Sequence, residues 1–369
     1  MRFLGEFRDP GRLRAAREAL RRAAEGLPFT TLMEVCGTHT MNAFRFGLRG
    51  MLPPNVRLLS GPGCPVCVTP NDYLDRAIAL ARRQDTLVAT FGDLMRVPGS
   101  RSSLERERAA GADVRVVYSP RDALEFARRE AGKKVLFLGV GFETTAPLVA
   151  STVLEARASG TVNFLVLVGH KLVPPALEAL LEARNGGLHG FLLPGHVSAV
   201  IGADAYRPLA RDRGIPCVIA GFEPLDMIQG IVLLLEQVRA RTAEVRNQYA
   251  RVVTPGGNRR AREVLERVFE PCDADWRGLG RIPLSGLRLR PEFREHDAEA
   301  VLPAEGLEPP REHPGCRCGE VLQGLVVPPE CPLFGRACRP DTPAGACMVS
   351  SEGTCAAYYK YGKDHFADE

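Results

Sequence analysis

The stretch "VNFLVLVGHKLVPPALEALLEARNGGLHGFLLPGH", residues 162–196, contains the pattern that decides the fold. Its two ends, residues 162–170 and 190–196, are short runs that are apolar on both faces, as is typical of buried parallel strands. The segment between them, near residues 174–185, has the length and periodicity of a helix. The stretch therefore predicts a strand, a helix and a second strand in succession.

The same alternation extends outward from this stretch over about 200 residues. Strands are predicted at residues 30–35, 56–61, 86–92, 114–119, 133–141, 162–170, 190–196 and 216–222, and helices near residues 8–25, 71–84, 121–132, 146–158, 174–185 and 224–241. Such alternation predicts an α/β architecture with right-handed crossover connections.

The predicted strands divide into two sets of four, which predicts two doubly wound parallel-sheet domains. We place the boundary near residue 131, so that residues 1–130 form the first domain and residues 131–245 the second. After about residue 245 the chain is rich in proline, glycine and charge and has little periodicity. Residues 246–369, which contain most of the cysteines, are therefore predicted to form a small third domain that a metal holds together.

Two predicted helix starts share one chemistry. Residues 69–72 read Thr-Pro-Asn-Asp and residues 119–122 read Ser-Pro-Arg-Asp. Each offers a hydroxyl for the N-cap, a proline for the first helical position and a carboxylate two residues later. Helices are therefore expected to begin at both places.

The composition excludes several classes of protein. The 369 residues carry a net charge of only +4, which argues against a nucleic-acid or anionic-membrane partner. No run of 18 apolar residues and no secretory signal is present, so a cytoplasmic protein that does not span a membrane is expected. In that compartment the 11 cysteines indicate metal ligands or redox thiols in preference to structural disulfides.

Cys64-Pro65-Val66-Cys67 is a CxxC motif with two interpretations, half of a zinc site or a redox pair. Zinc sites of this kind usually take a second CxxC, and the chain has none. Cys67 also precedes the helix predicted at Thr69-Pro70, where backbone amides and the helix dipole would lower the pKa of its thiol. We therefore favour redox or thiolate chemistry for this pair.

Cys36 and His39, in "MEVCGTHT" at residues 33–40, follow the first predicted strand. Three interpretations stay open from the residues alone. Cys36 is a buried structural thiol, a nucleophile with His39 as its base, or a soft metal ligand with His39 close by.

Further polar residues lie where other predicted strands end, which is the edge at which doubly wound sheets bind ligands. Any one of them is more simply a structural residue, but Glu143, His170, His196 and Glu223 together predict a polar cleft, and Asp93 with Arg96 forms either a surface ion pair or a support beside the site. The residues concerned are Asp93, Arg96, Glu143, His170, His196 and Glu223. The glycines of "GVGFETTAP" (139–147) are too weak a fingerprint to predict NAD binding.

Six cysteines lie in the last 54 residues: Cys316, Cys318, Cys331, Cys338, Cys347 and Cys355. Six thiols exceed what one four-ligand site requires, and zinc and a [4Fe–4S] cluster are both candidates. In an extended segment, residues two apart point to opposite faces, so Cys316 and Cys318 are expected to serve different purposes. A cluster with a nearby dithiol accounts for all six thiols, whereas structural zinc leaves two without a role.

Seven long motifs, in order along nearly the whole chain, resemble the hydrogenase maturation protein HypD family. They are "MEVCGTHT", "SGPGCPVCVTP", "FGDLMRVPGS", "GFETTAP", "LPGHVS", "GFEPLD" and "GACMVSSEGTCAAYYKYG". The resemblance implies two α/β domains around a central cleft and a smaller domain that carries a [4Fe–4S] cluster. It also implies a role in building the Fe(CN)₂CO group of [NiFe] hydrogenases, in complex with the small chaperone HypC and with cyanide received from HypE.

The resemblance further implies roles for individual residues. Cys36, with His39 beside it, would hold the iron under assembly, which carries CN and CO ligands, and Cys64 with Cys67 would be a redox pair. The cluster ligands would be Cys316, Cys331, Cys338 and Cys355, and Cys318 with Cys347 would form an exchangeable dithiol. Asp93, Arg96, Glu143, His196 and Glu223 would surround the cleft.

These expectations describe a redox-active assembly scaffold more than a stand-alone turnover enzyme. Soft thiolate ligation suits low-spin iron, and a cluster next to a dithiol can pass electrons to the Cys64–Cys67 pair by thiol exchange. The alternative is a thiol–disulfide oxidoreductase similar to ferredoxin–thioredoxin reductase, which shares the cluster and the dithiol but does not need the GTHT motif.

Overall fold

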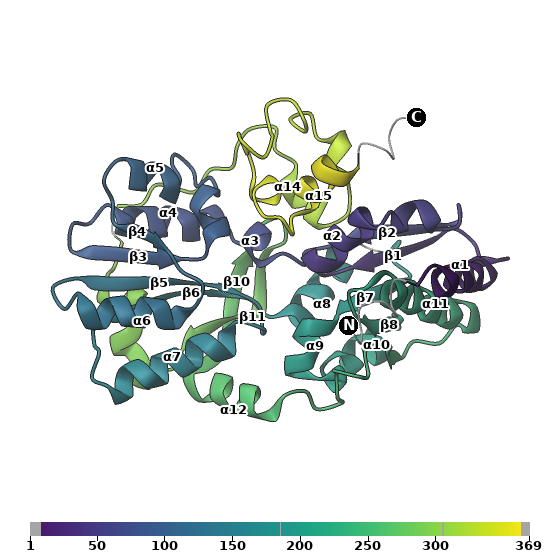
Figure 1. Cartoon of the computed structure of the whole chain (residues 1–369), viewed down its shortest axis with the longest axis horizontal. Coiled ribbons are helices and arrows are strands. Elements are labelled where there is room, and N and C mark those ends of the chain that lie inside the picture. The colour runs from purple at the N-terminus through teal and green to yellow at the C-terminus, as the bar shows by residue number, and fades with distance from the viewer. Residues whose placement is uncertain (1–8, 185, 305, 363–369) are drawn as a thin grey trace.

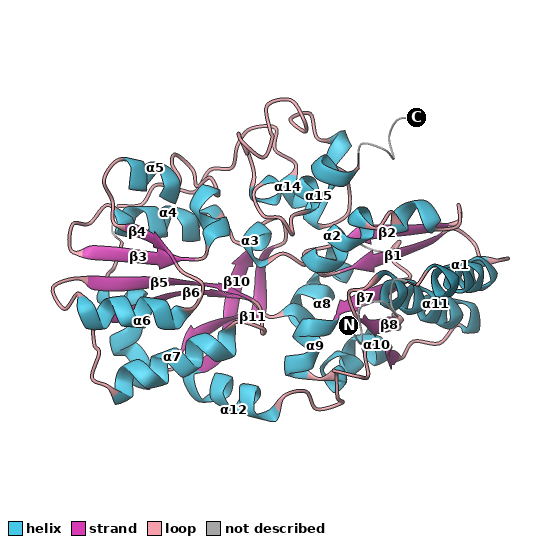
Figure 2. Cartoon of the chain, in the orientation of Figure 1, coloured by secondary structure: helices cyan, strands magenta, loops and turns pink. Residues whose placement is uncertain are grey.

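The computed structural model describes residues 9–184, 186–304 and 306–362 of the chain. Two lobes, each built on a parallel β-sheet with helices on both faces, lie side by side, and the C-terminal segment packs above their junction (Figures 1 and 2). The predicted α/β class is therefore confirmed.

Sheet A forms the core of one lobe. Its five strands are all parallel and run in the spatial order β2 (Val56–Ser60), β1 (Thr30–Glu34), β7 (Gly190–Pro194), β8 (Cys217–Ala220) and β9 (Val245–Asn247). Numbered along this sheet alone, the order is 2-1-3-4-5, which is a doubly wound arrangement.

Side chains that alternate along the strands of sheet A fill two separate cores. Leu32, Leu192 and Val218 face one core, and Met33, Phe191 and Ile219 face the other. The first core is covered by α1 (Pro10–Ala24) and α11 (Pro224–Ala240), and the second by α8 (Val173–Arg184) and α10 (Arg207–Arg213). Burial of both faces explains why these strands are apolar at successive positions.

Sheet B forms the core of the other lobe. Its four parallel strands run in the order β4 (Val114–Val116), β3 (Thr86–Thr90), β5 (Lys134–Gly141) and β6 (Phe164–His170). The helices of this lobe are α4 (Asn71–Ala81), α5 (Leu104–Ala109), α6 (Pro120–Arg129) and α7 (Ala146–Ala158).

The predicted assignment of strands to sheets is wrong. Strands β1 and β2 belong to the same sheet as β7 and β8, and the predicted boundary near residue 131 falls between β4 and β5, which share sheet B. The lobe built on sheet B is therefore inserted between β2 and β7 of sheet A. The two strands of the stretch at residues 162–196 are β6 and β7, and they lie in different sheets.

The predicted third domain, residues 246–369, also divides in the structure. Its first part forms α12 (Arg259–Val268) and the antiparallel hairpin of β10 (Phe269–Trp276) and β11 (Gly280–Leu289), followed by α13 (Ala298–Val301). These elements, which the sequence did not indicate, bury Phe269, Leu287 and Leu289 against the helix α7 side of sheet B. The far end of the hairpin, with Trp276 and Ile282, packs instead in the core that contains Met33 and Phe191, so the hairpin contributes to the cores of both lobes.

The remaining part is a cysteine-rich segment, residues 316–362, which has little regular structure. It contains the short helix α14 (Cys318–Leu322), a 3₁₀ turn at Ala346–Met348 and α15 (Thr354–Tyr361). Helix α15 packs against α2 (Gly37–Arg45), where the rings of Phe44 and Tyr358 lie tilted to each other with their centroids 4.3 Å apart. The segment therefore contacts the lobe of sheet A directly next to the "CGTHT" motif.

One of the two predicted helix caps is confirmed. Ser119 accepts a hydrogen bond from the Arg121 amide, and the Asp122 carboxylate accepts one from the Ser119 amide. The predicted Thr69 cap is wrong, because the Thr69 hydroxyl donates instead to the Pro65 carbonyl, 2.8 Å away, at the end of the one-turn helix α3 (Pro65–Val68).

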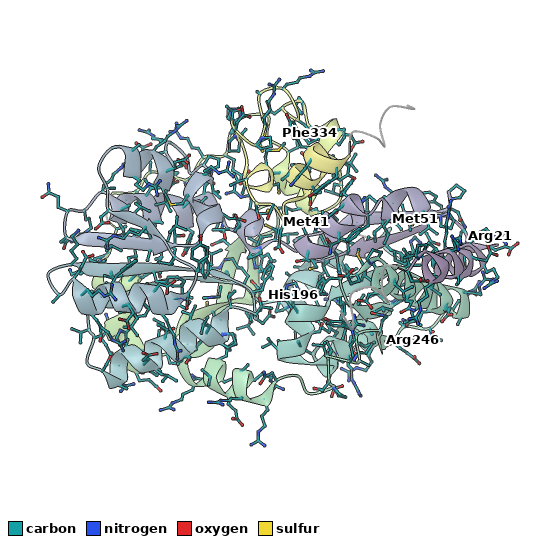
Figure 3. The ribbon with its side chains drawn as sticks, in the orientation of Figure 1. Arg21, Met41, Met51, His196, Arg246 and Phe334 are labelled. Carbon is teal, nitrogen blue, oxygen red and sulfur yellow. The ribbon has the colours of Figure 1, made fainter. Side chains whose placement is uncertain are left out.

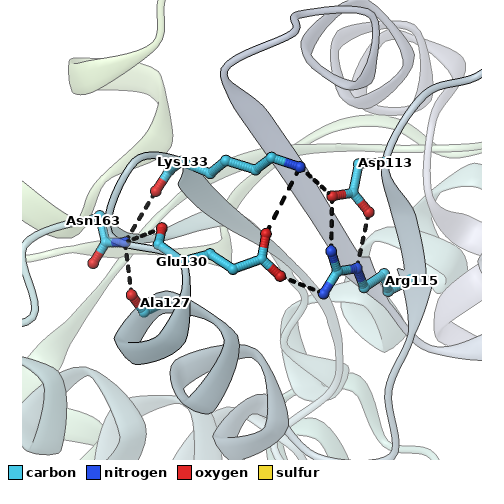
Figure 4. A network of polar contacts seen from close by, with 6 residues as sticks. All are labelled: Asp113, Arg115, Ala127, Glu130, Lys133 and Asn163. Carbon is cyan, nitrogen blue, oxygen red and sulfur yellow. Dashed lines mark hydrogen bonds and ion pairs between the residues drawn. The ribbon is translucent and has the colours of Figure 1, made fainter.

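A polar network at the amino-terminal edge of sheet B joins β4, α6 and β5 (Figure 4). Arg115 donates to both carboxylate oxygens of Asp113 at 2.9 Å, and Lys133 donates to the same carboxylate at 2.6 Å. Asn163 donates to the carbonyl oxygens of Ala127, Glu130 and Lys133. These bonds satisfy backbone carbonyls at the end of α6 that the helix itself leaves without partners.

No helix in the part of the chain that the structure describes is long and apolar enough to cross a bilayer.

Candidate functional site

The topological switch points of the two sheets indicate where a site lies, because doubly wound sheets bind ligands where the strand order reverses. In sheet A this point lies between β1 and β7, and Cys36 and His196 follow those two strands. In sheet B it lies between β3 and β5, and Asp93 and Glu143 follow those strands. His196 lies in the middle of the molecule, between the two lobes (Figure 3).

Cys36 is the residue just before α2, and its thiol contacts His196. The distance from Cys36 Sγ to His196 Nδ1 is 3.8 Å, and Cys36 is only 1% exposed. Burial raises the pKa of the thiol far above its ordinary value, although the amides of His39 and Thr38 oppose this. Burial also lowers the pKa of His196 to about 4. The pair is therefore an uncharged thiol beside a neutral imidazole.

Only the backbone amide of His39 interacts with the Cys36 thiol, whereas its ring, which was expected beside that thiol, lies against the turn after β8. Its Nε2 lies 2.9 Å from the Gly221 carbonyl, and its ring packs 5.0 Å from that of Phe222. Burial lowers the pKa of His39 to about 4, and its Nδ1 has no hydrogen-bond partner among the described residues. His39 thus joins α2 to the turn that follows β8, and His196 takes the place next to the thiol.

Glu34, which the sequence analysis did not single out, supports the Cys36 backbone. Its carboxylate accepts hydrogen bonds from the Cys36 amide at 3.1 Å and from the Thr40 hydroxyl at 2.5 Å. Burial raises the pKa of Glu34 to about 7, and contacts with Ser60 and Thr40 limit the rise. The only sequence feature that could have indicated this role is an acidic residue at the end of an otherwise apolar strand.

The cysteine-rich segment reaches the Cys36 site through Glu352, a second residue that the sequence analysis missed. Its carboxylate accepts a hydrogen bond from Thr38, and a side-chain carbon placed on Gly37 would lie 2.4 Å from Glu352 Cβ. Ser350 donates to Asp93 at 2.8 Å. This segment therefore contacts the sites at the ends of both β1 and β3.

The other predicted site residues lie further from the Cys36 thiol. Arg96 donates to the Pro340 carbonyl at 3.1 Å, so Asp93 and Arg96 each bind the cysteine-rich segment and do not pair with each other. Glu143 is buried and accepts a hydrogen bond from the Val173 amide, and burial raises its pKa to about 7. Glu223 precedes α11, next to the turn that holds His39.

The CPVC motif lies between Cys36 and the cysteine-rich segment. Gly63 packs so closely on Cys36 that a side-chain carbon there would lie 2.2 Å from the Cys36 nitrogen. The next residue, Cys64, begins α3 and accepts a hydrogen bond from the Cys67 amide at 3.2 Å. The Cys67 thiol interacts with the thiols of Cys64 and Cys347. Gly63 therefore connects the Cys36 site to a second group of thiols.

The predicted low pKa of Cys67 is wrong for the described structure. Burial, followed by the neighbouring thiols of Cys347 and Cys64, raises the pKa of Cys67 well above its ordinary value. The expected decrease in pKa assumed that a helix begins at Thr69 and Pro70, just after Cys67. Cys67 instead lies inside α3, the helical turn before them. The thiol accordingly meets other thiols and apolar side chains in place of free amides.

One small cavity gathers the cysteines of the C-terminal segment. Its lining includes Cys316, Cys318, Cys331, Cys338, Cys347 and Cys355. Cys318 Sγ and Cys347 Sγ are 2.9 Å apart, and both thiols are buried. The Cys347 thiol also interacts with those of Cys355 and Cys67. Cys347 is thus the point at which the cavity meets the CPVC motif.

Comparison with known proteins identifies the group to which these motifs belong. The sequence model of the HypD family, described as "Hydrogenase formation hypA family", matches residues 12–362. The chain belongs to the HypD family. It is 47% identical over 372 residues to the hydrogenase maturation factor HypD of Escherichia coli K12, with 98% of each chain covered. It is 48% identical over 379 residues to that of Azotobacter vinelandii, with 100% of this chain and 98% of the relative covered.

As a member of this family the chain is a hydrogenase maturation factor, and the donor set of its cysteine cavity fits an iron–sulfur group. Thiolates are the ligands that such clusters take from proteins. Within the described ranges, no three His, Cys, Asp or Glu side chains converge as the ligands of a single ion would. Six cysteine side chains line one cavity, which is more than the four thiolates that such a cluster takes.

Proposed function

We propose that this HypD-family protein is a cytoplasmic, redox-active scaffold on which the Fe(CN)₂CO group of [NiFe] hydrogenases is assembled. In this proposal Cys36 binds the iron, a HypC-like chaperone shares the site, and a HypE-like protein donates cyanide. The observation that carries the proposal is the position of the Cys36 thiol, at the switch point of sheet A and linked through Gly63 to the thiols of the CPVC motif. Thiolate is a soft ligand suited to iron that carries cyanide and CO.

We propose that His196 assists iron binding at Cys36. The thiol must lose its proton to bind the metal, since thiolate is the ligand form. His196 is the neutral base in contact with that thiol, at 3.8 Å. Because Cys36 is buried, the iron reaches it only when the residues that cover it move, and Glu352 is among these residues.

The contacts of Cys347 suggest a path for thiol–disulfide exchange. The Cys347 thiolate attacks the sulfur of Cys67 in a Cys64–Cys67 disulfide, so that a Cys347–Cys67 bond forms and Cys64 leaves as a thiolate, which takes up a proton. Cys318 then attacks Cys347 and releases Cys67, which also takes up a proton. The exchange transfers two electrons and two protons to the CPVC pair and leaves a Cys318–Cys347 disulfide.

Two electrons, delivered one at a time by an external donor, and two protons from solvent would return the Cys318–Cys347 disulfide to two thiols. We propose that Cys316, Cys331, Cys338 and Cys355 hold a [4Fe–4S] cluster, which supplies single electrons when bound. All four thiols line the same cavity as the Cys318–Cys347 pair. The close contact of that pair, at 2.9 Å, supports its assignment as the exchangeable dithiol.

The test replaces Cys36 with alanine and records the infrared bands of iron-bound cyanide and CO on the complex with a HypC-like protein. We expect the bands to disappear in Cys36→Ala. The matched control is Cys217→Ala, which removes a buried thiol in the core of sheet A and should keep the bands. Unchanged bands in Cys36→Ala would show that Cys36 is not the iron ligand.

The second candidate function is a general disulfide reductase similar to ferredoxin–thioredoxin reductase. The contact between Cys318 and Cys347 beside a cavity of thiols favours it. An assay with unrelated disulfide-bonded proteins distinguishes the two functions. Turnover of such substrates that does not depend on Cys36 would support the reductase, and no turnover would support the scaffold.

A further inference from the structure

A second polar pocket, remote from the cysteines of the proposed site, lies where β6 meets the β10–β11 hairpin. It has a volume of about 190 Å³ and lies between α4, the end of β6, the hairpin and α13. His170 and Lys171 line it from the end of β6, Asp72 from α4, and Cys272 and Asp275 from β10. Nothing in the proposed function uses these residues.

Polar groups without partners concentrate around this pocket. Both ring nitrogens of His170 and Oδ1 of Asp72 are buried without a hydrogen-bond partner, which is three of the ten such atoms in the described residues. Lys171 is only 6% exposed, and the charged groups that act on its ammonium are Asp275, Cys272 and Asp72. Buried polar groups in folded proteins are almost always paired, because an unpaired one has lost its hydrogen bonds to water without replacement.

The backbone fixes the position of Lys171. Its amide donates to the Gly141 carbonyl at 2.9 Å, and the amide of Leu172 donates to the Ser285 carbonyl at 2.8 Å. Lys171 also forms an isolated bridge with Gly286 of the hairpin. Burial is the main reason that the pKa of Lys171 is lowered to about 8, and the charges of Asp275, Cys272 and Asp72 act in the opposite direction.

Most other charged groups at the pocket already have partners. Arg76 pairs with Glu299 at 2.7 Å and with Oδ2 of Asp72 at 3.6 Å, and Arg288 pairs with Glu270 at 2.8 Å. Asp273 and Asp297 accept hydrogen bonds from the Leu284 and Glu299 amides. Asp275 has only a distant contact, 3.9 Å, with Arg281. The groups with the weakest contacts, and so the most available to a ligand, are the Lys171 cation, Oδ1 of Asp72 and the carboxylate of Asp275.

We propose that this pocket binds a small zwitterion, with its carboxylate on Lys171 and its ammonium group between Asp72 and Asp275. A cation and two carboxylates that face one cavity without pairing to each other match a ligand that carries both charges. α-Amino acids with small side chains are the chemical class with this arrangement. The cavity volume of about 190 Å³ is small, which favours a ligand of this size.

Calorimetric titration of the full-length protein with glycine, alanine, serine and aspartate tests the proposal. Acetate and methylammonium, which each carry one half of the zwitterion, are titrated in parallel. We expect at least one amino acid to bind with 1:1 stoichiometry and both half-ligands to bind about ten-fold more weakly or not at all, since a bond to a charged group contributes about 1.5–3 kcal/mol. Lys171→Met and Asp72→Asn should each weaken binding by about ten-fold or more. Lys134→Met, which changes a lysine that pairs with Asp85 outside the pocket, should not.

Chemical labelling of the unmutated protein provides a second measurement that does not depend on the variants folding. The bound amino acid should slow acetylation of Lys171 and alkylation of Cys272, as read by peptide mass spectrometry, and leave Lys134 unaffected. Equal binding of acetate and amino acid would instead identify an anion site and overturn the proposal. No binding by any amino acid, with no protection of Lys171, would show that the pocket holds only water and would overturn it as well.

Discussion

The hydroxyl of Thr38 donates a 2.6 Å hydrogen bond to Oε1 of Glu352, although 314 positions separate the two residues in the chain. Thr38 lies in the first turn of α2, two residues after Cys36, and Glu352 lies between Cys347 and Cys355. This bond joins the Cys36 site to the cysteine-rich segment. We therefore expect that a change in the bonding of Cys347 or Cys355 alters the Cys36 site through the residues around Glu352.

Replacing Glu352 with alanine should uncover Cys36. The change keeps the Cβ that packs on Gly37 but removes the carboxylate that bonds to Thr38 and also lies near Gly37, so the Cys36 thiol should react about ten-fold faster with iodoacetamide, and the free energy of unfolding should fall by about 1–2 kcal/mol. Peptide mass spectrometry at several labelling times gives the rate. Glu320→Ala, which removes a surface pair with Arg317, is the control and should leave the rate as it is. An unchanged rate in Glu352→Ala would contradict the covering role.

A side chain at residue 63 should disrupt the contact between the Cys36 site and the CPVC motif. The Cβ of Gly63→Ala would lie 2.2 Å from the Cys36 nitrogen and 2.4 Å from the Val35 carbonyl carbon. Both are backbone atoms, which can move away only at a large cost in free energy. We expect a loss of about 3 kcal/mol or more in unfolding free energy, measured by urea denaturation. Gly132→Ala, where no atom lies within 4 Å of the added carbon, should change stability by less than about 1 kcal/mol. Equal stability of the two variants would rule out the close contact.

The buried carboxyl of Glu143 should make stability depend on pH. Burial raises its pKa from 4.5 to about 7, so the folded protein keeps a proton that the unfolded chain loses between these pH values. The contribution of Glu143 to stability is therefore full below pH 4.5 and falls as the pH rises through 7, by about 3 kcal/mol in total. In Glu143→Gln, which resembles the protonated form, urea unfolding from pH 5 to 8 should show a smaller fall in stability. Glu125→Gln, at an exposed ion pair with Arg128, should retain the slope of the unmutated protein.

Mild oxidation should join Cys318 and Cys347 before other pairs. Their sulfur atoms are 2.9 Å apart, and Cys347 also interacts with Cys67, so a Cys67–Cys347 bond is the expected second product. Diamide treatment of the metal-free protein followed by peptide mapping would identify the bonds. Cys318→Ser should abolish the first product and increase the second, whereas Cys272→Ser should alter neither. A first product without Cys318 and Cys347 would contradict the assignment of the dithiol.

Much of the fold could be predicted from the sequence because helices and buried strands have local patterns. The eight apolar runs predicted as strands all form strands, and the six predicted helices all form, with ends that differ by a few residues. The Ser119 cap is equally local, since its three bonding groups lie within four residues. The hairpin of β10 and β11 was missed because its alternation is interrupted by a register shift between Cys272 and Ala274.

The site could be predicted only in part. The motif at residues 33–40 contained Cys36 and His39, but a sequence does not indicate that α2 turns the His39 ring toward Gly221 and leaves Cys36 facing His196. Glu34 and Glu352 were missed because their roles depend on burial and on contacts with distant elements. The low pKa expected for Cys67 failed for the same reason, since desolvation exceeds the effect of the nearby helix start.

The sequence by itself determined the α/β class, the elements and the presence of two groups of cysteines, because these follow from residue type and from periodicity along a few turns. Only the tertiary structure decided that β1 pairs with β7, where the Thr31 amide and the His189 ring meet across 158 positions, and that the lobe of sheet B is inserted between them. Parallel strands that are apolar on both faces resemble one another in sequence. The residues of one strand therefore do not indicate which other strand it pairs with. Their partners are fixed by how the helices and side chains of the whole chain fill the two cores, and that packing brings Cys36, His196 and Glu352 to one place.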